Sequence, residues 1–93
     1  MAEWDNQETA DLMRAVLSLK NASEAKRFFR DLLTEGELLE MGRRWKAARM
    51  LHDGASYATV EAETGLSSAT VARISKWLKE GTGGYRVVLK RLS

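Results

Sequence analysis

Hydrophobic residues recur every three or four positions along most of the 93-residue chain, and glycines fall between the segments that show this spacing. Such a period is typical of amphipathic helices, and no proline interrupts any of them. The pattern predicts helices near 6–20, from 23 onward, at 35–52, at 57–64, from 67 or 68 to 80, and at 85–92. We therefore expect an all-α protein with about six helices.

Polar residues and glycines mark the boundaries of these helices. Thr34 and Glu37 form a T-x-x-E capping box, in which each side chain accepts a hydrogen bond from the other residue's backbone amide. Gly54 is placed to end the third helix, and Gly65 turns the chain after the fourth. Further caps are expected at Asp5 or Asn6, Ser23, Ser56, and Ser67 or Ser68.

Two helices carry more apolar surface than a solvated helix leaves exposed. The second helix has Phe28, Phe29, Leu32 and Leu33 on one wide face, which is expected to pack against a partner. The apolar side of the third helix runs along its length. Large residues expected to be packed inside the protein are Trp45, Trp77, Val88, Leu89 and Leu92.

Residues 57–76 have the anatomy of a helix-turn-helix, with a short helix, a glycine turn, a cap and a second helix. Val60, Leu66, Val71 and Ile74 are the apolar positions that would hold the two helices at their crossing angle. Small and hydroxyl residues at the start of the second helix suit close approach to the major groove, and basic residues one turn later can reach phosphates. The candidate DNA-binding residues are Ser67, Ser68, Ala69, Thr70, Arg73 and Lys76.

Charge is divided unevenly along the chain. Residues 1–42 carry 5 basic and 9 acidic side chains, a net −4, whereas residues 43–93 carry 10 basic and 4 acidic side chains, a net +6. Clustered positive charge attracts a polyanion, so the second half is where double-stranded DNA is expected to bind. An ordinary solvated surface with uneven charge is the alternative interpretation.

Other function classes find little support in the composition. The chain has no cysteine and a single histidine, so neither thiol chemistry nor a histidine ligand pair for a metal is available. No glycine loop of the phosphate-cradling kind is present, and we expect no enzyme activity, no catalytic residue and no metal site. No apolar run is long enough to span a bilayer and nothing resembles a signal peptide, so a cytoplasmic location without membrane contact is expected.

A longer pattern extends beyond the helix-turn-helix. It begins at Leu32-Leu33-Thr34 and continues through Gly42-Arg43-Arg44, Gly54, Glu63-Thr64-Gly65 and the helix at 68–73. In this pattern residues 32–92 resemble the tryptophan repressor family. The tail, Gly-Gly-Tyr-Arg followed by Val-Val-Leu, is similar to the YerC/YecD-type branch of repressor-related regulators.

This resemblance implies an intertwined homodimer and a bacterial-type transcriptional regulator, with repression as the expected mode. Within a single domain of residues 1–93, residues 1–55 would dimerise, 56–80 would read DNA and 85–93 would form the C-terminal helix. The two reading helices would then lie about 34 Å apart, a spacing established for helix-turn-helix dimers, the tryptophan repressor among them, and would select a two-fold symmetric operator.

The resemblance also implies an effector site beside the reading helix. Thr34, Arg44 and Arg73 fall on the positions that hold the amino-acid corepressor in the tryptophan repressor. Tryptophan and another small acidic or aromatic effector remain alternatives, and no cofactor is certain. Arg44 is otherwise a solvated helix charge and Arg73 a phosphate contact. A protein-interaction module that uses the helical fold without binding DNA is the alternative function.

Overall fold

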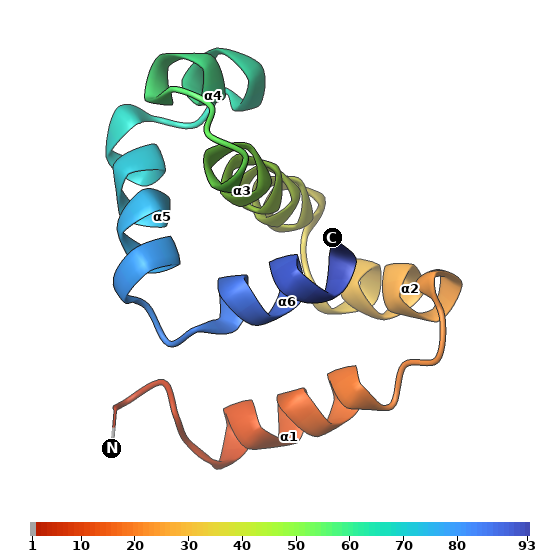
Figure 1. Ribbon diagram of the computed structural model, residues 1–93. Helices are drawn as coiled ribbons and strands as arrows, with labels where there is room; N and C mark the ends of the chain where they lie inside the picture. Colours follow the sequence, from red (N-terminus) through yellow and green to blue (C-terminus); the bar gives the residue numbers. More distant parts are fainter. Residues whose placement is uncertain (1) are drawn as a thin grey trace. The chain divides into compact units, whose positions relative to one another are not determined.

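The computed structural model describes residues 2–93, which form six α-helices and no strand (Figure 1). Over these residues the predicted all-α class and helix number are confirmed. No helix in this range is long and apolar enough to cross a membrane. The helices are α1 (Gln7–Leu17), α2 (Ala22–Leu32), α3 (Glu35–His52), α4 (Tyr57–Thr64), α5 (Ser68–Glu80) and α6 (Gly84–Leu92).

The chain forms two compact units, one that ends at Leu38 and one that covers Leu39–Ser93. In the first unit, the side chain of Asn6 caps α1 by accepting a hydrogen bond from the Thr9 amide at 2.9 Å. The Asn21 side chain caps α2 through the Glu24 amide at 2.9 Å, so the expected cap at Ser23 is wrong. Asn21 has extended backbone angles, as a cap requires, whereas Ser23 already lies within the first turn.

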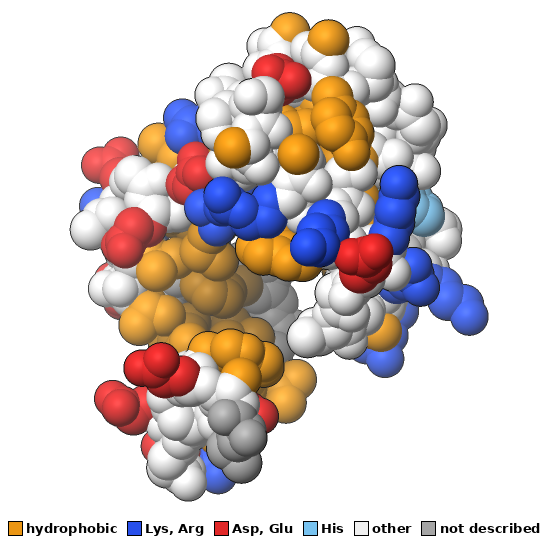
Figure 2. All heavy atoms as spheres, turned by 90° about the vertical axis from the view of Figure 1, so that its left-hand side faces the viewer, with side chains coloured by type: hydrophobic (Ala, Val, Ile, Leu, Met, Phe, Trp, Pro, Cys, Tyr) orange, Lys and Arg blue, Asp and Glu red, His pale blue; other side chains and the backbone are white. Residues whose placement is uncertain are grey.

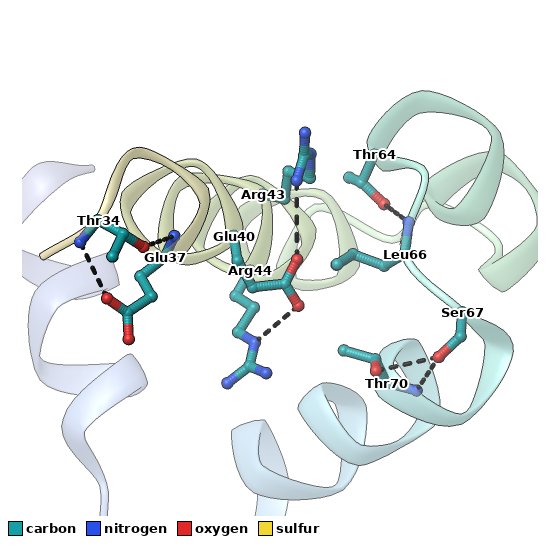
Figure 3. Close-up of polar contacts among 9 residues, drawn as sticks. All are labelled: Thr34, Glu37, Glu40, Arg43, Arg44, Thr64, Leu66, Ser67 and Thr70. Carbon is teal, nitrogen blue, oxygen red and sulfur yellow. Dashed lines mark hydrogen bonds and ion pairs between the residues drawn. The ribbon is translucent and has the colours of Figure 1, made fainter.

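The predicted capping box at the start of α3 is confirmed (Figure 3). The Thr34 amide donates to a Glu37 carboxylate oxygen at 2.9 Å, and the Glu37 amide donates to the Thr34 hydroxyl at 3.1 Å. The hydrogen bond from the Thr34 backbone lowers the pKa of Glu37 below its usual value, and a hydrogen bond with the Thr34 side chain lowers it further by a smaller amount. The negative charge also suits the N-terminal end of the helix dipole.

A single hydrophobic core holds the second unit together. Ala47 and Ala48 of α3 are fully buried, and their small side chains let α4 and α5 approach the helix closely. In Figure 1, α4 and α5 meet at a corner, and α6 leaves the other end of α5. The buried members of the core are Ala47, Ala48, Val60, Leu66, Val71 and Ile74.

Gly54 ends α3 as the sequence predicts. Its φ of 93° lies in the left-handed region, which lets the chain fold back over the last turn of the helix. The Ala55 amide then donates to the Met50 carbonyl at 3.0 Å, and the Gly54 amide donates to the Leu51 carbonyl at 3.1 Å. This pair of hydrogen bonds is a Schellman motif and fixes where α3 ends.

The C-terminal helix contacts the core on one side only. Leu89 of α6 is buried, and Tyr85 stacks on Trp45 of α3 with 6.3 Å between the ring centroids. Val88 and Leu92 are 42% and 70% exposed. The expectation that these two residues are packed is therefore wrong for the single chain, because only the Leu89 side of α6 reaches the core.

Candidate nucleic-acid interface

The turn between α4 and α5 is built around Gly65 and Thr64. Gly65 has a φ of 73°, in the left-handed region, and its amide donates to the Glu61 carbonyl at 2.9 Å. The buried Thr64 hydroxyl donates to the Val60 carbonyl at 2.7 Å and accepts from the Leu66 amide at 3.2 Å (Figure 3). A single hydroxyl therefore joins the end of α4 to the residue that follows the turn.

The apolar residues predicted to hold the two helices do so. Val60 and Val71 are fully buried, Ile74 is 1% exposed, and Leu66 is 7% exposed. All four lie in one cluster with the alanines of α3. Because protein cores are close-packed, this cluster fixes the angle at which α5 crosses α4.

Ser67 is the N-cap of α5, which decides between the two serines that the sequence left open. Its hydroxyl oxygen accepts from the Thr70 amide at 3.2 Å and donates to the Thr70 hydroxyl at 3.0 Å (Figure 3). Ser68 is the first residue of the helix. The Ser67 hydroxyl is thus engaged in starting the helix.

The predicted DNA-binding residues share the outer side of α5. Ser67, Ser68, Ala69, Arg73 and Lys76 are exposed, and Thr70 is half-buried. In Figure 2, which looks onto the side that carries α5, Lys and Arg side chains spread across the visible face near this helix. The exposed start of a helix also presents backbone amides and the positive end of its dipole, which favour phosphate groups.

Arg73 has an aromatic partner that the sequence reasoning missed. The carbon at the centre of its guanidinium lies 6.0 Å from the centroid of the Trp77 ring, one turn along α5. Trp77 is 46% exposed, so the expectation that it belongs to the core is wrong for the single chain. The spacing of four residues on a helix was the available indication of this contact.

Arg44 is paired with an acidic residue on its own helix. One Glu40 carboxylate oxygen lies 3.3 Å from Nε of Arg44, and the other lies 3.8 Å from a guanidinium nitrogen of Arg43 (Figure 3). All three side chains are partly exposed, so each pair contributes little to stability. Thr34, the remaining effector candidate, lies in the first unit and takes part in the capping box.

A cavity of about 770 Å³ lies beside the C-terminal end of α5. Aromatic side chains of Trp45, Trp77 and Tyr85 line it, together with Val88, Glu80 and the 81–84 segment. This cavity is not visible in the sequence, because the residues that form it come from three helices. Among residues 2–93 there is no group of three or more His, Asp or Glu side chains that could hold a metal ion.

The left-handed glycine turn, the buried contact between α4 and α5, and the exposed polar start of α5 define an all-helical protein of the helix-turn-helix class. The sequence profile of the Trp repressor protein family matches residues 7–93. The chain belongs to this family.

Individual relatives agree with this assignment. Over 85 residues the chain is 40% identical to the uncharacterized protein YerC of Bacillus subtilis, with 91% of this chain and 82% of YerC covered. A TrpR-like protein from Eubacterium eligens has a similar crystal structure, with a TM-score of 0.90 and 37% identity over 97% of this chain and 93% of that chain. The crystal structure of a candidate Trp repressor from Staphylococcus aureus is also similar, with a TM-score of 0.89 and 33% identity. The match covers 99% of this chain and 95% of that chain.

Proposed function

We propose that this protein is a sequence-specific DNA-binding transcriptional regulator, with repression as its mode of action. The observation that carries the proposal is the start of α5, the proposed reading helix. Its first turn is exposed and capped by Ser67, and the buried Thr64 and Leu66 hold the turn that precedes it. Ser68, Ala69 and Thr70 would contact base edges, and Arg73 and Lys76 would contact phosphates. The net charge of +6 over residues 43–93 supports the same assignment.

The protein would act as an intertwined homodimer. Neither α1 nor α2 has a buried residue in the single chain, although both carry large apolar side chains. Trp4, Met13, Leu17 and Leu32 are each at least half exposed. Apolar surface of this kind is typical of a protein interface, and a second copy of the chain would bury it. Residues 1–55 would then form most of the dimer and 56–80 the reading head.

A small-molecule effector would bind beside the reading helix. The family resemblance assigns this role to Thr34, Arg44 and Arg73, and the two arginines both lie on exposed parts of the second unit. A guanidinium can pair with a ligand carboxylate and can stack on an aromatic ring. Tryptophan is the first compound to test, and other small acidic or aromatic compounds follow it.

Selection of bound fragments from random DNA tests the function at near-physiological salt, with and without tryptophan. We expect enrichment of a two-fold symmetric site, because each chain of the dimer presents the same reading helix. Thr70→Ala should change which sequence is preferred, whereas Thr70→Ser keeps the hydroxyl and should retain the original preference. Equal loss of affinity for every sequence in Thr70→Ala would contradict base reading by this residue.

A second pair of variants tests the phosphate contacts. Lys76→Ala should weaken binding to all sequences to a similar extent and reduce the slope of log affinity against log salt by about one. Lys26→Ala is the matched control, because Lys26 is an exposed lysine on α2, outside the proposed reading head. A shallow salt slope on every DNA tested would instead favour a protein-interaction module.

A further inference from the structure

Arg86 connects the last helix to the end of the reading helix. Its Nε donates to the Leu78 carbonyl at 2.8 Å, and one of its terminal nitrogens donates to the Lys79 carbonyl at 2.8 Å. Both carbonyls belong to the last turn of α5, where a helix has no backbone amides left to pair with them. A guanidinium is suited to this role because its planar group presents several donors in a fixed geometry.

The position of Arg86 in its own helix is otherwise unfavourable. It lies in the first turn of α6, where the helix dipole disfavours a positive charge and the turn itself holds no acidic residue. The C-terminal end of α5 carries the opposite partial charge and attracts the guanidinium. The electrostatics of Arg86 therefore favour the contact with α5 over its place in α6.

Two neighbouring features make the corner between α5 and α6 a defined structure. At Gly81 an added Cβ atom would lie 2.5 Å from the Trp77 carbonyl oxygen, so a side chain there requires the backbone to move. Tyr85, the neighbour of Arg86, stacks on Trp45 and attaches the start of α6 to α3. The corner is thus held from both sides, by Arg86 on α5 and by Tyr85 on α3.

We propose that Arg86 is a positioning residue that sets the angle between the reading helix and α6, and through it the distance between the two reading helices of the dimer. The proposal rests on the DNA-binding function proposed above. Arg86 itself need not touch DNA, since it acts through the Leu78 and Lys79 carbonyls that it binds in α5. Its loss would leave the reading residues unchanged and loosen only the angle between α5 and α6.

Spin labels test the positioning role without DNA. The chain has no cysteine, so Ala72→Cys on α5 and Lys90→Cys on α6, both exposed positions, provide two unique labels. Labelled chains diluted into unlabelled protein report the α5–α6 distance within one chain, whatever the oligomeric state. We expect a narrow distribution in the parent and a broader one in Arg86→Met, with Arg86→Lys intermediate. Arg91→Met, an exposed arginine on the same helix, is the control and should match the parent.

DNA sites with two identical half-sites at varied separation test the functional consequence. The wild type should prefer one separation. Arg86→Met should accept a wider range and lose about tenfold in affinity at the preferred one, while its salt slope stays the same. Identical distance distributions and identical spacing profiles in Arg86→Met and Arg91→Met would overturn the proposal.

The two proposals fail in different ways. A wild-type protein with no spacing preference and no selected site would refute DNA reading, and the spin-label distances would then decide the role of Arg86 on their own. If Arg86→Met does not fold, as judged by circular dichroism, Arg86→Lys provides the comparison. An unbroadened distribution in that variant would overturn the positioning role.

Discussion

The Thr64 hydroxyl is the most sharply testable feature of the turn between α4 and α5. Thr64→Val replaces the hydroxyl by a methyl group of similar size, so the packing volume at this 6% exposed position is kept. The substitution removes the hydrogen bond to the Val60 carbonyl and the acceptor of the Leu66 amide. Leu66 is itself only 7% exposed, so water has little access to the orphaned amide.

The expected cost follows from these two contacts. An unpaired buried amide costs about 1–3 kcal/mol, and the hydrophobic gain of one added methyl group offsets roughly 0.8 kcal/mol of this. The lost hydrogen bond to the Val60 carbonyl adds about 0.5–1.5 kcal/mol. We therefore expect Thr64→Val to lower the free energy of unfolding by about 1–4 kcal/mol. Thr64→Ser keeps both hydrogen bonds and loses one methyl group, at about 0.8 kcal/mol. The more hydrophobic variant should thus be the less stable one.

Urea unfolding followed by circular dichroism measures the difference, at one fixed protein concentration because dimerisation affects apparent stability. The free energy of unfolding should fall with urea concentration at the same slope in all three proteins, which would show that the variants differ in stability alone. If Thr64→Val were as stable as the parent or more so, the hydroxyl would not hold the turn. The exposed Thr82→Val change is the control, and it should have little effect.

Three further predictions concern stability. Gly81→Ala should lower the free energy of unfolding by about 2–3 kcal/mol, because the new Cβ meets the Trp77 carbonyl. At Gly65 a Cβ meets nothing within 4 Å, so Gly65→Ala should lose only the ~1 kcal/mol of a left-handed φ. Equal losses for the two variants in urea unfolding would contradict this difference. The pKa of Glu37 is lower in the folded protein than its usual value of 4.5. Its carboxylate therefore contributes to the free energy of unfolding above pH 4.5, and this contribution is lost as pH falls through the folded pKa. Glu37→Gln should therefore weaken the acid dependence of unfolding, and an unchanged acid profile would refute the role of the carboxylate. Ile74→Ala, at a 1% exposed core position, should cost about 2–5 kcal/mol in the same urea assay, and a loss below 1 kcal/mol would contradict its place in the core.

Much of the fold could be predicted from the sequence, because the caps that set the ends of the helices act between residues close together in the chain. The bounds of α3 and α4 agree with the prediction, since a capping box, a left-handed glycine and a serine cap act within a few residues. The cap of α2 was predicted at Ser23, yet Asn21 takes it. Both residue types cap helices equally well, and only the backbone angles of the folded chain distinguish them.

The candidate site was predictable to a smaller extent. The hydroxyl-rich start of α5 and its basic residues are visible in the sequence, and the structure places them on one exposed side. The contact of Arg86 with Leu78 and Lys79 is not visible there, because it depends on how α6 folds back after the glycine-rich segment. The exposure of Trp77 is not visible in the sequence either. The sequence shows that this face of α5 is apolar, but it does not show which helix covers the face.

The partners of Arg44 and Arg73 change what an effector must do to bind there. Glu40 already pairs with Nε of Arg44, so a ligand carboxylate would bind the remaining guanidinium nitrogens beside a like charge. An aromatic ring on the Trp77 side of Arg73 would have to replace Trp77. A partly exposed ion pair formed beside a like charge gains at most about 1 kcal/mol, and one ring in place of another gains little more. Neither arginine alone therefore supplies much of the binding free energy of an effector. The affinity of an effector at these residues depends mainly on the apolar surface that it buries.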